Sequence, residues 1–237
     1  MNRLRTANSH LLWTAGALCL LLAWDASALD LLLARPWATP DGFGLRDHWL
    51  LSSVLHEGAR RAAWLPVLWL LAGIAYPSGI LRRLSRADRV QWAAGTLLAL
   101  AAVAALKQGS HTSCPWDLAE FGGHVRWVSH WSWQSSDGGA GHCFPAGHAS
   151  AGFAFLSGYF VLRRHDARQA WLCLAAALAA GLVLGVAQQL RGAHFMSHTA
   201  WTAWLCWTVA WLVDLVAARF TLIREQGTQA LISPGRS

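Results

Sequence analysis

The feature that most constrains the fold is a series of long apolar segments, separated by loops that carry most of the charge. A membrane-spanning helix needs about 20 mostly apolar residues. The candidate segments are 11–34, 62–77, 90–106, 148–162, 169–187 and 197–218. Only 13% of the residues are charged, whereas soluble proteins have about 25%. The sequence therefore predicts an all-α, polytopic membrane bundle of about six transmembrane helices, with 1–237 as a single domain.

Arginines gather in alternate loops and predict how the chain crosses the membrane. The clusters are Arg3 and Arg5; Arg82, Arg83, Arg86 and Arg89; Arg163, Arg164 and Arg168; and Arg219 and Arg224. Cytoplasmic loops carry an excess of Lys and Arg, so we expect these clusters and both termini in the cytoplasm. The net charge of +7 thus indicates topology and not nucleic-acid binding. The loops 35–61 and 107–147 and the turn 188–196 then face outside.

Some features near the N-terminus fit this layout less simply. Arg60 and Arg61 lie on the outer side, so we interpret 46–60 as an amphipathic segment at the interface. The basic start and Ala26-Ser27-Ala28 also resemble a cleavable signal peptide, which leaves open whether 1–28 is removed. Asp30 is unfavourable inside a bilayer. We expect it near the outer interface, paired with an arginine, in preference to a catalytic role.

Ionisable groups of the predicted outer face are concentrated at three places, the first of which is the end of the segment 90–106. Lys107 is the only lysine in the chain. A lysine at this position can simply extend to the lipid headgroups. Alternatively, its ammonium is a compact charge suited to a phosphate oxygen. The sequence leaves both roles open.

The second place is Phe144-Pro145-Ala146-Gly147-His148, directly before the segment 148–162. A turn that opens a helix presents free backbone N–H groups and the positive end of the helix dipole, which together bind anions. His148 would lie beside the anion and could donate a proton to a leaving group. A capped helix start with a polar interfacial histidine is the alternative for so short a motif.

The third place is the turn between the last two apolar segments. If its later part is helical, Arg191, His194 and His198 share one face at i, i+3 and i+7. An arginine next to a nucleophilic histidine suits phosphoryl transfer, because the guanidinium holds the phosphoryl oxygens. His194 would need a partner for its second ring nitrogen, and His198 is the candidate. The alternative is a polar turn with hydrogen-bonded histidines.

These three motifs, in this order, resemble those of the type 2 phosphatidic acid phosphatase superfamily of integral-membrane lipid phosphatases. That family has Lys, six residues, Arg-Pro; then Pro-Ser-Gly-His; then Ser-Arg, five residues, His, three residues, Asp. Here the motifs are Lys107 with Cys114-Pro115, Pro145-Ala146-Gly147-His148, and His194 with His198. The resemblance covers about 90–215 and includes the outer-face site and the location in the cell inner membrane of a bacterium.

The resemblance implies roles for these residues. The third-motif histidine of the family forms a phosphohistidine, and the second-motif histidine protonates the leaving group. His194 is therefore the expected nucleophile and His148 the expected general acid. Lys107 and the backbone of Ala146 and Gly147 are expected to bind the phosphate. No metal or other cofactor is expected, because cationic side chains and the helix start supply the positive charge.

The chain also departs from the family pattern. Cys114 replaces the first-motif Arg, and Gln188 stands where the family has the third-motif Arg. His198 replaces the Asp that orients the nucleophile. We interpret these changes as a diverged subfamily in which Arg191, with Arg126 as a further candidate, restores the guanidinium charge. Other acids that could orient His194 are Asp117, Glu120 and Asp30.

Two of the five cysteines, Cys114 and Cys143, lie in the outer loop 107–147. An outer compartment is oxidising, so we predict a disulfide between them. It would join the first motif to the second and stabilise the chain by roughly 3–4 kcal/mol in the chain-entropy model.

The predicted function is hydrolysis of a phosphate or diphosphate monoester on a membrane lipid at the outer (periplasmic) face. A phosphotransferase that uses the same phosphohistidine is one alternative. A membrane redox or metal protein, built on the cysteine pair and His111, His124, His130 and His142, is another. An inactive relative that only binds lipid headgroups is a third. The identity of the lipid and the oligomeric state stay open.

Overall fold

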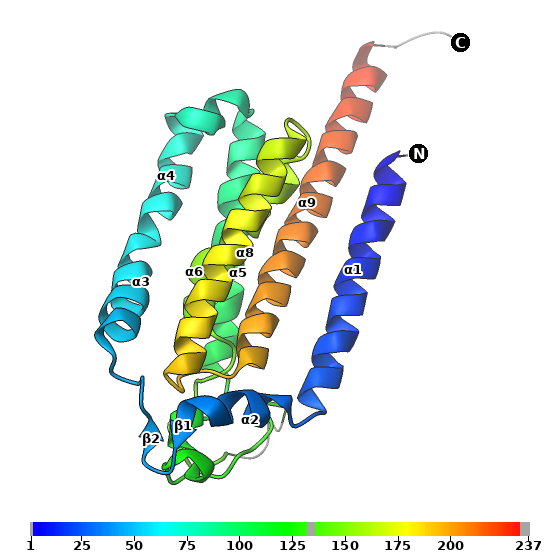
Figure 1. Cartoon of the computed structure of the whole chain (residues 1–237). Helices are drawn as coiled ribbons and strands as arrows, with labels where there is room; N and C mark the ends of the chain where they lie inside the picture. Colours follow the sequence, from blue (N-terminus) through cyan, green and yellow to red (C-terminus); the bar gives the residue numbers. More distant parts are fainter. Residues whose placement is uncertain (1, 132–135, 233–237) are drawn as a thin grey trace.

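The computed structural model describes residues 2–131 and 136–232 of the 237 residues, without the side chains of 2–7, 222 and 224–232. It is an all-α bundle of long, roughly parallel or antiparallel helices, with a small covering layer at one end (Figure 1). The longer helices are α1 (Asn2–Asp25), α4 (Trp64–Ala75), α5 (Arg86–Gln108), α8 (Ala167–Leu190) and α9 (Met196–Ile232). The predicted all-α membrane bundle is confirmed.

Hydropathy and length identify the membrane-spanning parts of the described chain. Four segments qualify: Leu50–Arg83, Arg86–Gln108, Ala167–Leu190 and Met196–Thr221. A fifth span is possible if Asn8–Asp25 and Leu29–Trp37, which are bent by 79°, count together. The fourth predicted segment, 148–162, is not among these spans. It is helical but broken into η6 (Gly147–Ala149), α6 (Ser150–Phe153), η7 (Ala154–Leu156) and α7 (Ser157–Leu162). It is enclosed by α5, α8 and α9. Neighbouring helices, and not lipid, therefore surround this short segment.

Two predicted features near the N-terminus are wrong in detail. The segment 11–34 is not continuous, because the helix breaks after Asp25 and resumes as α2 (Leu29–Ala34) across the end of the bundle (Figure 1). The segment 46–60 is not a separate interfacial helix. It forms a π-helix, η2 (Leu50–Gly58), that continues into α3 (Ala59–Ala62) and α4, and η3 (Gly79–Arg83) follows.

Local signals explain where the central helices begin. Ser85 caps α5, since its Oγ accepts from the Asp88 N–H at 3.1 Å while the Asp88 carboxylate accepts from the Ser85 N–H. Asp166 caps α8 by accepting from the Gln169 N–H at 3.1 Å. Both caps satisfy N–H groups that a helix start leaves without partners, and the cap of α5 is reciprocal.

The core of the bundle lies between α5, α6, α8 and α9, and small residues let these helices approach closely. Phe153, Ala99 and Cys206 are fully buried there. A Cβ added at Gly152 would lie 2.2 Å from the backbone nitrogen of Gly181. The backbones of α6 and α8 therefore touch, as is usual for small residues at membrane helix interfaces.

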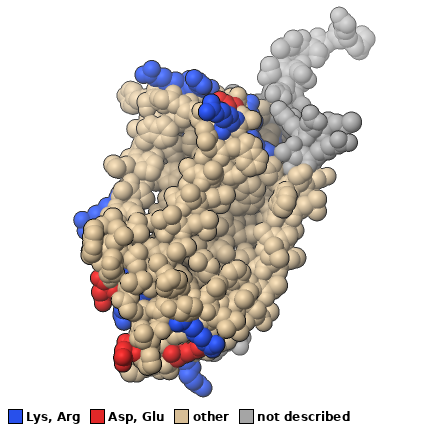
Figure 2. Space-filling view, viewed as in Figure 1, with Lys and Arg blue, Asp and Glu red and all other residues tan. Residues whose placement is uncertain are grey.

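Charged residues gather mainly at the two ends of the molecule, and most of the surface between them is uncharged, apart from a few charged side chains along the left edge (Figure 2). At the end opposite the covering layer, Arg164 binds Asp88 at 2.9 Å. This contact places the loops after α4 and after α7 on the same side, as the arginine clusters predict. The side chains of Arg3, Arg5 and Arg224 lie outside the described part.

The covering layer consists of α2, a two-stranded sheet and the loop 107–147. Strands β1 (Ala38–Thr39) and β2 (Gly42–Phe43) are antiparallel. The loop includes the 3₁₀ turns η4 (Pro115–Asp117) and η5 (Ala119–Phe121). Phe43, Phe121 and Phe195 share a buried cluster, so this layer packs directly against the turn before α9.

Candidate functional site

The three sequence motifs meet under the covering layer, at one end of the bundle. Lys107 lies in the last turn of α5, Gly147 and His148 open the helical run that leads to α7, and His194 lies in the turn between α8 and α9. The Lys107 side chain extends over Gly147, since a Cβ added at Gly147 would lie 3.4 Å from the lysine Cδ. The absence of a side chain at Gly147 thus lets the lysine approach this backbone.

The site carries positive charge at Lys107 and Arg191. Among the described residues, no carboxylate lies within ion-pair distance of Lys107 or Arg191. Their charges, together with that of Arg60, act on the ring of His148. Arg60 itself pairs with Glu57 at 2.9 Å, and Asp47 offsets part of the charge of Arg191. The remaining positive charge attracts a phosphate anion, because the protein cover screens it little.

His148 has a half-buried histidine neighbour and a ring nitrogen without a partner in the described chain. Its Nε2 is buried and has no hydrogen-bond partner within the described chain. Its ring stacks on that of His56, with centroids 3.8 Å apart and an interplanar angle of 27°. Sequence reasoning missed His56, because it lies far upstream in η2 and no motif surrounds it.

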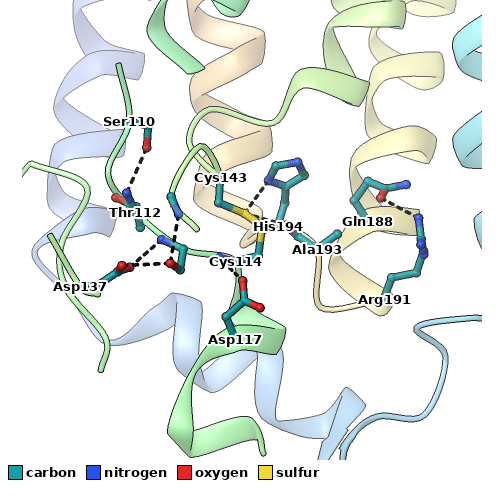
Figure 3. The surroundings of a disulfide bond; sticks show 12 residues. Ser110, Thr112, Cys114, Asp117, Asp137, Cys143, Gln188, Arg191, Ala193 and His194 are labelled. Atoms are coloured by element: carbon teal, nitrogen blue, oxygen red, sulfur yellow. Dashed lines mark hydrogen bonds between the residues drawn. A yellow bond between two sulfur atoms is a disulfide. The ribbon is translucent and has the colours of Figure 1, made fainter. Parts of the chain in front are cut away.

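His194 is only 4% exposed and points toward the disulfide (Figure 3). Its Nδ1 lies 3.5 Å from Sγ of Cys143. Burial, and then the charge of Lys107, lower the pKa of His194 well below the usual histidine value. The imidazole is therefore neutral at neutral pH, which is the form that a nucleophilic histidine requires.

The predicted disulfide between Cys114 and Cys143 is present, with Cα atoms 5.1 Å apart. Sγ of Cys143 also lies 2.8 Å from the carbonyl oxygen of Ala193, and the Cys143 N–H donates to the Thr112 carbonyl at 2.9 Å. The disulfide therefore joins the loop after Lys107 to the second motif, and Cys143 contacts the turn that holds His194.

His198 lies beside His194, but a turn in the chain, and not a shared helical face, brings the two together. The two rings have centroids 5.8 Å apart, and no hydrogen bond joins them. The prediction of one helical face for Arg191, His194 and His198 is wrong. Gly192 has a φ of +72° and its missing side chain leaves room for the Phe43 ring, so the chain turns there. His198 is 1% exposed, and its Nδ1 has no partner within the described residues.

Arg191 folds back toward the position where the related family carries its third-motif arginine. Its Nε donates to the Arg46 carbonyl at 2.8 Å, and its Nη1 donates to Oε1 of Gln188 at 3.2 Å (Figure 3). Because Nε and Nη1 are held in this way, the Nη2 amino group of Arg191 is available to donate to a bound anion. Arg126, the other predicted source of guanidinium charge, is exposed and makes no hydrogen bond or ion pair with these residues.

The backbone predicted to bind phosphate is only partly available. The Ala146 N–H donates to the His198 carbonyl at 3.3 Å, so it is occupied, and its predicted role is wrong in this structure. The Gly147 N–H has no partner in the described part of the chain. Gly147 therefore supplies the free donor of this motif.

None of the acids considered as orienting groups contacts His194. Asp30 binds the N–H of Ser197 at 3.1 Å, as well as its Oγ, and not an arginine as we expected. Asp117 accepts from the Cys114 N–H at 3.2 Å, and Glu120 pairs with Arg35 at 2.8 Å. Asp30 thus fixes the start of α9, and the other two stabilise the cover.

The donors close enough to share a metal ion differ from those that the sequence indicated. Within the described residues, ligand atoms of Cys143, His194 and His198 lie within 4.8 Å of one another. The loop residues His111, His124, His130 and His142 belong to no such group. His130 instead pairs with Asp25 at 3.1 Å and stacks on Phe144, which supports the second motif from outside.

An apolar cavity of about 300 Å³ adjoins the second motif. It lies between α1, α5, α9 and the loop 107–147. Its lining includes Leu22, Leu106, Phe144, Trp201 and Trp204. Phe144 is three residues from Gly147 along the chain, so this cavity begins close to the second motif.

Comparison with known proteins gives one result. The family model described as PAP2 superfamily matches residues 90–221, which is more than half of the chain and includes all three motifs. No curated protein and no solved structure gives a significant match.

Proposed function

Since the chain belongs to the PAP2 superfamily, a family of phosphatases, we propose that it hydrolyses a phosphate or diphosphate monoester on a membrane lipid. The observation that carries the proposal is the convergence of Lys107, His148 and His194, from three separate elements, at one end of the bundle. A single phosphoryl group needs cations around its oxygens, a nucleophile and an acid, and these residues provide all three.

The first step is attack of His194 on phosphorus. Cys143 is next to Nδ1 of His194, so we assign the free lone pair to Nε2. Lys107, Arg191 and the Gly147 N–H bind the phosphoryl oxygens while the N–P bond forms and the ester P–O bond breaks. The guanidinium of Arg191 is held in place by its bonds to Arg46 and Gln188 before the reaction, which makes such stabilisation effective.

His148 supplies the proton that the departing lipid alkoxide needs. Burial and the nearby charges, including that of Lys107, lower the pKa of His148 to about 3, so this ring is neutral before a substrate binds. A bound phosphate anion next to Lys107 opposes these charges and favours the protonated imidazolium of His148. In the second step, His148 takes a proton from water, which attacks the phosphohistidine and releases inorganic phosphate and neutral His194. We propose that His56, stacked on His148, holds this ring in place.

A lipid substrate is supported by the apolar cavity of about 300 Å³ beside Phe144. Its size is at the lower end of ligand sites and fits part of an acyl or prenyl chain. Because the site is at the end opposite the arginine-rich loops, we propose that it faces the periplasm, with both termini in the cytoplasm of a bacterial inner membrane.

The test is release of inorganic phosphate from a panel of lipid phosphates and diphosphates by the purified protein in mixed micelles. We expect release that persists in the presence of a chelator and is lost in His194→Ala. Release that requires an added divalent ion, or that survives in His194→Ala, would contradict the proposal.

A phosphotransferase is the second candidate, because His194 is almost fully buried and a lipid alcohol could replace water in the second step. Reaction in ¹⁸O-labelled water distinguishes the two. Hydrolysis puts ¹⁸O into the released phosphate, whereas transfer yields a new phospholipid without labelled phosphate.

A further inference from the structure

The disulfide and the two buried histidines form a group that the proposed reaction uses only in part. We call Cys114, Cys143, His194 and His198 the cysteine–histidine cluster. Ligand atoms of Cys143, His194 and His198 lie within 4.8 Å of one another, and all three residues are buried. Cys114 is joined to Cys143 by the disulfide, so a second sulfur lies next to these donors.

Two of these groups are not satisfied by the protein around them. Nδ1 of His198 is buried without a hydrogen-bond partner in the described chain, although the residue is only 1% exposed. Nδ1 of His194 faces Sγ of Cys143 at 3.5 Å, and a disulfide sulfur is a weak acceptor for it. Both imidazoles therefore have a nitrogen free to bind a better partner.

Reduction changes what the sulfurs can do. A disulfide sulfur is not the ligand that metals prefer, whereas a thiolate is. A trialkylphosphine reduces the bond with one water: the disulfide takes up two electrons and two protons to give two thiols, and the phosphine becomes its oxide. A divalent metal then displaces the two thiol protons. Two thiolates and two imidazoles are the donor set of many structural zinc sites.

We propose that reduction of the Cys114–Cys143 disulfide creates a buried Zn²⁺ site whose ligands are Cys114, Cys143, His194 and His198. Zinc–sulfur bonds of about 2.3 Å and zinc–nitrogen bonds of about 2.0–2.1 Å need donors somewhat closer together than 4.8 Å. The two sulfurs must instead move apart to become separate ligands, and breaking the S–S bond allows both this separation and the approach of Cys143 to the imidazoles. Zinc bound there would occupy His194 and stop the reaction; this consequence alone rests on the proposed function.

The direct test measures bound zinc without any substrate, so it is independent of the proposed activity. The purified protein is reduced with a phosphine, desalted without oxygen, equilibrated with Zn²⁺ and analysed for metal. We expect one more zinc per chain in the reduced than in the oxidised protein. Cys114→Ser/Cys143→Ser is the matched control, because it keeps Cys19, Cys173 and Cys206 and should bind no additional zinc. Equal zinc in all three samples would overturn the proposal.

A second measurement covers the case in which reduction unfolds the protein. Cys114→Ser leaves Cys143 as a free thiol without any reductant and keeps three of the four donors. With Co²⁺ as the probe, we expect a thiolate-to-metal charge-transfer band and the ligand-field bands of a tetrahedral ion in this variant. Adding His198→Ala should weaken cobalt binding at least tenfold. Absence of the charge-transfer band in the folded variant, judged by circular dichroism, would also overturn the proposal.

Discussion

At the level of single residues, the group that accompanies the proposed nucleophile is unusual. The related family orients this histidine with an aspartate, but here Cys143 is next to Nδ1 of His194 and His198 makes no hydrogen bond to it. A neutral partner stabilises an imidazolium less than a carboxylate does. We therefore expect reactivity to depend on positioning and on the surrounding cations more than on a charge relay.

The general-acid role of His148 can be tested by His148→Ala. We expect kcat to fall by about 10²–10⁴-fold, the usual contribution of a general acid, for lipid substrates with poor leaving groups. The loss should be much smaller for p-nitrophenyl phosphate, whose leaving group needs no proton. His124→Ala, an exposed loop histidine, is the matched control and should retain wild-type rates. An equal loss with both kinds of substrate would exclude this role.

The pH dependence follows from the environment of His194. The pKa of His194 is lowered by burial and by the charge of Lys107, and the imidazole attacks only when it is neutral. Activity is therefore present above this lowered pKa and is lost as the pH falls through it. With p-nitrophenyl phosphate, and after correction for ionisation of the ester, the acid limb of kcat/KM should lie below the ordinary histidine value of about 6.5. An acid limb at or above 6.5 would contradict a neutral, buried nucleophile.

At the level of elements, close helix packing positions the second motif. Gly152 in α6 touches the backbone of Gly181 in α8, and α6 directly follows His148. Gly152→Ala should lower the free energy of unfolding by about 1–3 kcal/mol, as overpacking does, and should reduce the thermal midpoint measured in detergent. Gly16→Ala is the control, since an added Cβ in α1 meets nothing within 4 Å. Equal midpoints for both variants would show that α6 and α8 are not in contact.

Much of this arrangement could be predicted from the sequence, because apolar length and arginine position determine spans directly. The breaks could not. Nothing in the sequence separates a helix bent after Asp25 from a continuous one, and the π-helix Leu50–Gly58 depends on tertiary contacts. The candidate site was predictable where motifs carry it, at Lys107, His148 and His194. His56 was not, since it reaches His148 only through the packing of η2 against the bundle.

At the level of the whole molecule, a polar network holds together the end opposite the site. Asp214 in α9 accepts from Arg163 at 2.6 Å and from Gln91 at 2.9 Å. It also pairs with Arg164, which reaches Asp88 in α5. The network thus joins α5, α7 and α9 on the arginine-rich side, and the site occupies the other end of the same helices (Figure 1).

Removing the central carboxylate separates stability from activity. Asp214→Asn leaves two arginines without their shared acid. It should destabilise the protein by up to about 3 kcal/mol, below the upper range for buried pairs because water reaches part of both arginines. The thermal midpoint should fall while kcat/KM, measured well below that midpoint, stays at the wild-type value. A large loss of kcat/KM at unchanged stability would show that the two ends are coupled.

The central claim is that His194 becomes covalently phosphorylated. The direct measurement is rapid acid-free quenching of the protein during turnover of a ³²P-labelled lipid phosphate, followed by peptide mapping. We predict an acid-labile, base-stable label on His194 that forms in the wild-type protein and is absent from His194→Ala. A wild-type protein that turns over substrate while its label lies on another residue, or never forms, would contradict the account.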